Sequence, residues 1–333
     1  MRRAVCWAVV VGLVAGSGVA FAGAAPPAWA TKDLKAGIIG TDTSHVPAFT
    51  GCFARHPEWR IKVVAAYPAG SKDLPSSWNR VQKYAKTLRE KFGVEIVDSI
   101  EALLAKVDVV LVEDVDGRPH LEHARPVFRA GKRLFIDKPF TASLADAREI
   151  VRLSKETGVP FFSCSCVRFQ PEQAKFRHYK GVGKLEKAQG SSPMHIEPHH
   201  PDLFWYGIHG VEALYTVLGR GCVSVKREAG PELDITTGTW ADGTIGVFRG
   251  VRNTKKHKYT PLIKVWGSEG EAESKGGYNY NGLVATMAEF FHTGKAPIDP
   301  LETLEMVEFM TAAQLSKERG GAEVKLEELR AKK

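Results

Sequence analysis

The first half of the chain alternates short apolar runs with amphipathic stretches. The runs have the length of buried strands and lie at residues 35–41, 61–66, 107–112, 134–136 and 160–164. The stretches between them, such as 81–92, 120–130 and 143–157, carry apolar residues at helical spacing. Alternation of strand and helix is typical of a parallel sheet covered by helices. We therefore predict a Rossmann-type domain over residues 31–160.

The pattern changes after Arg168. Strand-like segments follow one another with little helix between them, at residues 185–195, 222–228, 232–239, 243–249 and 261–266. Amphipathic helices are expected at 207–218, 281–292 and 300–318. Consecutive strands joined by turns such as Asp242-Gly243 are typical of antiparallel sheets. The predicted fold is α/β, with a second, α+β domain over residues 161–333 that contains an open, mostly antiparallel sheet.

Residues 1–30 have the pattern of a secretory signal peptide. Arg2 and Arg3 precede an apolar run over 4–22, and A-x-A sequences end at Ala22 and Ala30. The run is short and rich in glycine for a membrane span, which needs about 20 apolar residues. We therefore expect a periplasmic or extracellular protein with no stable membrane insertion after cleavage.

The composition and charge of the chain indicate what kind of molecule it binds. The chain has 333 residues, 44% hydrophobic and 25% charged, which is ordinary for a globular protein. The formal net charge is +8, but the basic residues are scattered along the chain. A nucleic-acid-binding protein would gather them into one stripe. We expect a small-molecule substrate and no nucleic acid.

The turn after the first predicted strand is an altered dinucleotide-binding turn. The usual pattern is G-x-G-x-x-G, and the chain has Gly40-Thr41-Asp42-Thr43-Ser44-His45. The second glycine normally lets the backbone approach the pyrophosphate, and the third lets helix and strand pack closely. The second strand also lacks a terminal acid for the ribose hydroxyls, since none follows Tyr67 before Asp73. The residues therefore depart from the usual nucleotide-binding pattern at two places, the glycine turn and the end of the second strand.

Later motifs carry a family resemblance. They are the runs Val115-Asp116-Gly117-Arg118-Pro119-His120, Ala130-Gly131-Lys132, Asp137-Lys138-Pro139, Arg168-Phe169 and Tyr206-Gly207-Ile208-His209-Gly210-Val211-Glu212. Their order and spacing resemble those of Gfo/Idh/MocA sugar oxidoreductases, over nearly all of residues 34–318. The family's asparagine is replaced by Gly117, and the first aspartate of its histidine helix by Trp205.

The resemblance implies NAD or NADP as cofactor, and a homo-oligomer paired through the open sheet. The residues that it implies for cofactor binding are Gly40, Thr41, Asp42, Thr43, Ser44, His45, Asp116, Gly117, His120, Asp137 and Lys138. It implies Lys138 and His209 as catalytic residues and places Arg168 near the substrate. Oxidation of an alcohol needs a base for the hydroxyl proton, which suits a neutral imidazole beside an ammonium. Trp205 is a candidate for stacking on a sugar, with a role in the core as the alternative.

A histidine cluster lies outside the motifs of the resemblance. In an extended segment, His195, Glu197 and His199 point to the same side, and His200 follows directly. Three interpretations remain open: a loop that binds sugar hydroxyls, a structural turn, or a divalent metal site. We include His195, Glu197, His199 and His200 among the candidate substrate residues.

These observations favour an exported oxidoreductase that moves a hydride between a tightly bound nicotinamide cofactor and a sugar or polyol hydroxyl. The altered glycine turn and the histidine cluster keep a non-redox lyase or hydrolase on the same scaffold as an alternative, with a possible divalent metal. A sugar- or glycan-binding protein without catalysis is the third hypothesis.

Overall fold

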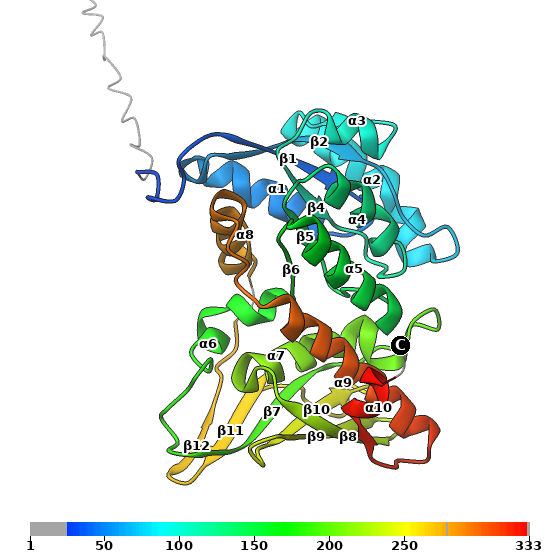
Figure 1. The fold of residues 1–333 in the computed structure, drawn as a ribbon, viewed down its shortest axis with the longest axis vertical. Coiled ribbons are helices and arrows are strands. Elements are labelled where there is room, and N and C mark those ends of the chain that lie inside the picture. Colours follow the sequence, from blue (N-terminus) through cyan, green and yellow to red (C-terminus); the bar gives the residue numbers. More distant parts are fainter. Residues whose placement is uncertain (1–24, 278, 332–333) are drawn as a thin grey trace, which may run out of the picture.

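The protein contains two sheets, one above the other, joined by helices (Figure 1). The structure, a computed structural model, describes residues 25–277 and 279–331. Most of the expected signal peptide therefore lies outside the described residues. The predicted fold class, a parallel-sheet domain followed by an α+β domain, is confirmed.

The first sheet is parallel throughout. Its strands are β1 (Leu34–Ile39), β2 (Ile61–Tyr67), β3 (Glu95–Ile96), β4 (Val109–Val112), β5 (Leu134–Ile136) and β6 (Phe161–Ser163). They lie in the order β3-β2-β1-β4-β5-β6. The helices are α1 (His45–Arg55), α2 (Pro75–Phe92), α3 (Ile100–Leu104), α4 (His120–Arg129) and α5 (Leu144–Thr157), with a 3-10 turn at Pro57–Trp59. Because β1 lies beside both β2 and β4, the chain changes direction at β1, where open parallel sheets bind ligands.

Local signals explain where these helices begin and end. The Ser143 hydroxyl accepts a hydrogen bond from the backbone N–H of Asp146 at the start of α5. Gly93 and Gly158 follow α2 and α5 in the left-handed conformation that ends many helices. Strand β4 is buried along its whole length, as expected for the centre of a parallel sheet.

The second sheet has seven strands. They are β7 (Leu185–Pro193), β8 (Cys222–Ala229), β9 (Leu233–Trp240), β10 (Ile245–Val251), β11 (Ile263–Gly267), β12 (Gly270–Glu273) and β13 (Val324–Lys325). Their order is β12-β11-β7-β10-β9-β8-β13, with β7 and β10 parallel and the other neighbours antiparallel. The helices are α6 (Pro171–Ala174), α7 (Ile208–Leu218), α8 (Asn281–Thr293), α9 (Pro300–Glu318) and α10 (Leu326–Arg330).

Helices α8 and α9 tie the domains together. α8 returns to the first domain and packs against α1, beside it in Figure 1. α9 packs on β8 of the second sheet and also contacts α5 and β6 of the first domain. α7 packs on β7 and β10. The two domains therefore share one continuous set of packing contacts.

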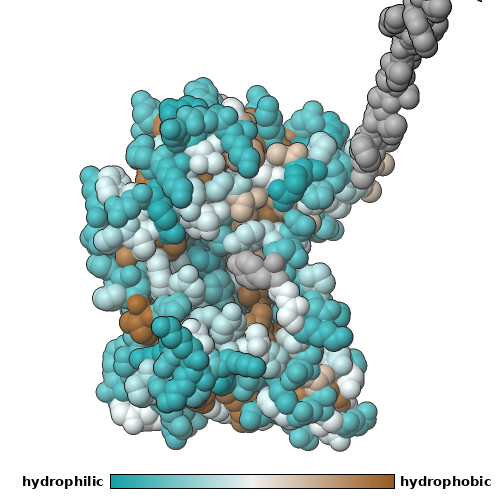
Figure 2. Space-filling view, turned by 180° about the vertical axis from the view of Figure 1, so that it is seen from behind, coloured by the Kyte–Doolittle hydropathy of each residue, from teal (hydrophilic) through white to brown (hydrophobic). Residues whose placement is uncertain are grey.

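The surface is mostly hydrophilic, with hydrophobic residues in small groups on the face drawn in Figure 2. Within the described part of the chain, no helix is both long enough and apolar enough to cross a membrane.

The predicted strand over 160–164 corresponds to β6, and the apolar residues that follow it do not continue the strand. The apolar run 160–169 leaves the sheet at Ser163 and turns into a 3-10 helix over Cys166–Phe169. The Ser165 hydroxyl caps this helix by accepting a hydrogen bond from the backbone N–H of Val167. A capped turn therefore follows directly on the strand.

Candidate functional site

A pocket of about 300 Å³ lies at the carboxyl end of the first sheet, where the two domains meet. It is lined by Thr43, Ser44, His45, Ser76, Arg80, Val115, Lys138, Trp205, Tyr206, His209 and Tyr280. Ligands of open parallel sheets bind at this edge. We therefore take this pocket as the candidate site.

Lys138 and His209 reach the pocket from different domains. Lys138 follows β5 by two residues, and His209 is the second residue of α7. The Nδ1 of His209 lies 2.7 Å from the Ser165 hydroxyl, which leaves Nε2 as the ring nitrogen available to a substrate. Burial and the nearby Lys138 charge lower the pKa of His209 to about 3. The ring is therefore neutral near pH 7.

The N-terminus of α1 faces the same pocket. Ser44 is its N-cap residue and makes no side-chain cap. In the first turn the N–H groups of His45 and Val46 donate to Thr43 at 3.4 Å and Pro47 has no N–H, so the helix end acts on the pocket through its dipole. Thr43 and Ser44 line the pocket next to Arg80 of α2. Among the described residues, the Arg80 Nε has no hydrogen-bond partner. A helix N-terminus beside a guanidinium favours a bound anion.

Asp42, in the position of the second glycine, points away from this pocket. Its carboxylate accepts hydrogen bonds from the Ser77 hydroxyl at 2.5 Å and from the Val115 backbone N–H at 2.9 Å. Burial, and after it the nearby Asp114 charge, raise the pKa of Asp42 to about 7. The retained Gly40 has φ +87°, and a Cβ there would lie 2.7 Å from the Asp114 carboxyl carbon.

The loops after β2 and β4 are tied to each other above β1. The Ser71 hydroxyl donates to Asp116 at 2.5 Å, and Arg118 pairs with Asp73 at 2.8 Å. Although burial opposes it, hydrogen bonds from His200, Arg118 and Ser71 hold the pKa of Asp116 below its usual value. Gly117 has no space for a side chain, because a Cβ would lie 2.7 Å from the Thr141 backbone.

The histidine cluster forms a turn between β7 and α7 instead of an extended segment. Its members have separate partners. The Nδ1 of His199 lies 2.7 Å from Glu197, and the Nε2 of His200 lies 3.0 Å from Asp116. The His195 ring contacts Tyr206 with centroids 5.0 Å apart. None of His195, Glu197, His199 and His200 lines the pocket described above, whereas Trp205 does.

Arg168 and His120 are held inside the protein. Arg168 is 2% exposed and pairs with Glu212 of α7 at 2.7 Å and with Glu302 of α9. It therefore joins two helices and does not line the pocket. His120 places its two ring nitrogens 3.0 Å from the carbonyl oxygens of Asp114 and Phe140, so it fixes the loops after β4 and β5.

A buried polar cluster lies behind one wall of the pocket. The Nδ1 of His45 is 2.6 Å from the Oδ2 of Asp137, and Glu113 lies close to both. Burial first, and then the neighbouring Asp137 charge, raise the pKa of Glu113 well above its usual value. Sequence analysis missed Glu113, although a carboxylate directly after a buried strand of a parallel sheet is itself a signal.

Sequence analysis also missed Arg80, Ser76, Tyr206 and Tyr280 as pocket residues. Ser76 and Arg80 lie on a helix face that gives no sequence signal for a site. Tyr280 precedes α8, whose return to the first domain is a tertiary feature.

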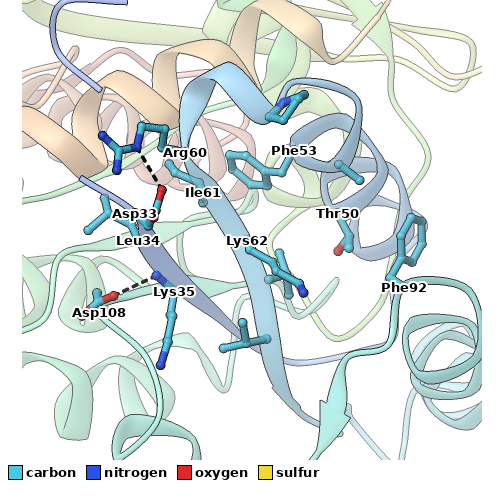
Figure 3. Close-up of a pocket in the computed structure, with 14 residues that line it drawn as sticks. Asp33, Leu34, Lys35, Thr50, Phe53, Arg60, Ile61, Lys62, Phe92 and Asp108 are labelled. Carbon is cyan, nitrogen blue, oxygen red and sulfur yellow. Dashed lines mark hydrogen bonds and ion pairs between the residues drawn. The ribbon is translucent and has the colours of Figure 1, made fainter. Parts of the chain in front are cut away.

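A larger cavity, of about 660 Å³, lies at the opposite end of the first sheet. Figure 3 shows it beside the starts of β1 and β2, with Asp33 bonded to Arg60 at 2.9 Å and the Lys35 backbone bonded to Asp108 at 2.8 Å. The carboxyl ends of the strands do not reach it. We therefore exclude it as the candidate catalytic site.

Comparisons with known proteins identify relatives of the fold. Residues 34–164 match the family model GFO_IDH_MocA, described as an oxidoreductase family with an NAD-binding Rossmann fold. An uncharacterized oxidoreductase from Streptococcus pneumoniae serotype 4 is 32% identical over 90 residues, which is 26% of this chain and 23% of that relative. The match thus spans less than a quarter of the relative's length.

Solved structures share the fold over most of the chain. An oxidoreductase from Agrobacterium radiobacter in complex with NAD+, L-tartaric acid and magnesium has a TM-score of 0.71 and 15% identity, covering 89% of this chain and 99% of that one. A scyllo-inositol dehydrogenase from Lactobacillus casei with bound NAD(H) and scyllo-inositol has a TM-score of 0.68 and 14% identity, with the same coverage. At these identities the likeness establishes the fold.

Proposed function

We propose that this chain, whose residues 34–164 match an oxidoreductase family with an NAD-binding Rossmann fold, is an oxidoreductase of the Gfo/Idh/MocA type that transfers a hydride between a nicotinamide cofactor and a sugar or polyol hydroxyl. One observation carries the proposal. Lys138 and His209, from different domains, line a single pocket together with the N-terminus of α1. An ammonium, a neutral imidazole and an anion-binding helix end are the groups that this reaction needs.

The residues around the pocket fit the phosphate and nicotinamide end of NAD or NADP. Thr43, Ser44 and Arg80 offer hydrogen-bond donors and positive charge to the phosphates. Asp42 does not repel them from within the pocket, since its carboxylate is bonded to Ser77 and Val115. The contacts Ser71–Asp116 and Arg118–Asp73 would have to open to admit the adenosine end between the β2 and β4 loops.

The protein's own groups would handle the proton. When bound, the nicotinamide supplies the hydride acceptor. The Nε2 of His209 accepts the hydroxyl proton, while Ser165 holds the ring through Nδ1. The Lys138 ammonium stabilises the negative charge that develops on the substrate oxygen. Trp205, which lines the pocket, offers an apolar face to a sugar ring.

The substrate class is supported by fold relatives. The Lactobacillus casei structure contains scyllo-inositol, a polyol, and the Agrobacterium radiobacter structure contains L-tartaric acid, a hydroxy acid. We assign the sugar and polyol class because neutral hydroxyl groups suit a site that offers an aromatic ring for stacking and the His209 imidazole as hydrogen-bond acceptor.

Export is part of the proposal. Within the described residues, Ala30 is buried and the Trp29 ring contacts His292 with centroids 5.5 Å apart. Cleavage after Ala22 would keep these contacts, whereas cleavage after Ala30 would remove Trp29. N-terminal sequencing of secreted protein should therefore begin at residue 23, and a start at Met1 would refute the signal peptide.

The central experiment measures cofactor and turnover together. Protein purified natively and then denatured should release NAD or NADP, detected by mass spectrometry, and should reduce or oxidise it with a panel of polyols and sugars. Lys138→Met and His209→Asn should each lower kcat by roughly 10²- to 10⁴-fold, the usual contribution of a positioned acid or base.

Lys258→Met is the matched control, because Lys258 is exposed and remote from the pocket. It should leave kcat unchanged. Absence of released NAD(P) together with unchanged turnover in both pocket variants would reject the proposed reaction.

A further inference from the structure

Glu113 is a buried carboxylate without a partner. It follows β4 directly, is 0% exposed, and among the described residues neither of its carboxylate oxygens has a hydrogen-bond partner. The Oδ1 of Asp137, fully buried beside it, is also unpartnered. Isolated carboxylates in a protein interior are strongly destabilising unless they are paired or bind a metal. Something must therefore stabilise the unpartnered carboxylate oxygens of Glu113 and Asp137 in the folded protein.

The neighbouring groups provide one. His45, Glu113 and Asp137 each offer a ligand atom, and these atoms all lie within 4.8 Å of one another. Zinc lies about 2.0–2.2 Å from nitrogen and carboxylate ligands and holds them tetrahedrally, so its ligand atoms are about 3.3–3.6 Å apart. Small side-chain rotations would bring the three ligand atoms to this spacing around one ion. The three side chains come from the start of α1 and from the ends of β4 and β5, all at one edge of the first sheet.

We propose that His45, Glu113 and Asp137 bind a divalent first-row transition metal at the wall of the pocket. One imidazole and two carboxylates form a mixed nitrogen and oxygen donor set, which suits zinc or manganese better than magnesium, an ion that prefers oxygen ligands and retains its waters. The Lys138 ammonium supplies one positive charge near the two carboxylates, and a dication compensates both fully. Because His45 also lines the pocket, the ion would lie beside bound substrate.

This site differs from the histidine cluster singled out in the sequence. His199 is paired with Glu197 and His200 with Asp116, and among the described residues their ligand atoms do not converge as those of His45, Glu113 and Asp137 do. The proposed ligands include the two side chains with unpartnered carboxylate oxygens. The metal site also stands independently of the proposed redox reaction, because its test measures binding and stability without turnover.

The test uses the full mature chain, stripped with a chelator and titrated calorimetrically with Zn²⁺, Mn²⁺ or Mg²⁺. We expect one Zn²⁺ or Mn²⁺ per chain, weaker Mg²⁺ binding, and a Tm that rises with added Zn²⁺. Glu113→Gln and His45→Ala should weaken Zn²⁺ binding by at least roughly tenfold, since loss of even an outer-shell partner costs that much. Glu113→Gln should be at least as stable as wild type in metal-free buffer, because among the described residues the Glu113 carboxyl group has no hydrogen bond to lose.

Glu232→Gln is the matched control. Glu232 forms an exposed pair with His257 at 2.9 Å, so the same substitution is made beside a histidine outside the pocket, and Zn²⁺ affinity should not change. Binding that persists in both pocket variants would overturn the proposal, as would the absence of stoichiometric binding to wild type. If a variant fails to fold, the visible spectrum of Co²⁺ added to the metal-free wild type tests whether the proposed site binds a metal. Bands of a nitrogen-ligated site support the proposal, and the spectrum of hydrated Co²⁺ overturns it.

Discussion

Asp42 takes the place of a glycine that normally lets a nucleotide approach the backbone. Its carboxylate joins α2, through Ser77, to the loop after β4, through Val115. This residue therefore links a helix and a loop that a glycine could not join. The link has an electrostatic cost, because the group is buried close to Asp114.

At the scale of single residues, the first prediction concerns how the stability of the fold depends on pH through Asp42. The pKa of Asp42 is about 7 in the folded protein and 3.8 in a model peptide, so the folded state binds the proton more tightly. Its contribution to stability is therefore complete below pH ~4 and is lost as pH rises through about 7, by at most roughly 4 kcal/mol. Asp42→Asn cannot ionise and should gain stability relative to wild type between pH 5 and pH 8, measured by urea unfolding.

Asp242→Asn serves as the control for this measurement. The backbone N–H of Thr244 lowers the pKa of Asp242, so the residue stays ionised throughout this range. Its stability difference from wild type should be the same at pH 5 and pH 8. An equally constant difference for Asp42→Asn would show that Asp42 is ionised at both pH values.

At the scale of elements, the position of α7 depends on two glycines. A Cβ on Gly190 of β7 would lie 2.0 Å from the carbonyl oxygen of Gly210 and 2.7 Å from the backbone nitrogen of Leu214. Helix and strand thus touch through their backbones. His209 precedes Gly210, so the same contact fixes the depth of the imidazole in the pocket.

Gly190→Ala should push α7 away from the sheet. We expect a loss of about 1–3 kcal/mol of stability from overpacking and a fall in kcat/KM through displacement of His209. Gly276→Ala is the control, since a Cβ there meets no atom within 4 Å. Thermal unfolding measures the loss of stability, and steady-state turnover measures the fall in kcat/KM. Unchanged values for Gly190→Ala would mean that the sheet accommodates the extra methyl group.

The elements of the first domain could be predicted from the sequence because each strand is a continuous apolar run between turn residues. The end of β6 could not, since Ser165 caps a 3-10 helix where the apolar run continues. The edge strands β3 and β13 each have two residues, too few for a periodic pattern. Arg168 lies in a motif, but its ion pairs with Glu212 and Glu302 depend on packing between distant helices.

At the scale of the whole molecule, the second sheet has one face without helices among the described residues that pack on it. Along β9, fully buried residues alternate with half-buried ones, and Ile235 of the second set lies between Glu228 and Arg249 on the neighbouring strands. A half-exposed face with apolar and charged residues suits contact with a second copy of the chain.

We expect the mature protein to form a homo-oligomer through this face. Light scattering should give a multiple of the chain mass, and Ile235→Glu should shift the population toward monomer by placing a second carboxylate beside Glu228. A monomeric wild type at micromolar concentration would contradict this expectation. An oligomer that is unaffected by Ile235→Glu would place the contact on another surface.

The order of strands in the second sheet has a consequence for synthesis. All six strands of the first sheet have been synthesised once residue 163 is made, so Lys138 can reach its position while the rest of the chain is still being made. β7 lies inside the second sheet, yet its parallel neighbour β10 ends only at residue 251, and the edge partner of β8 comes at residues 324–325. Contacts of such long sequence separation form slowly. The nascent chain therefore acquires the lysine side of its pocket well before the histidine side, and remains without the pocket until synthesis is nearly complete.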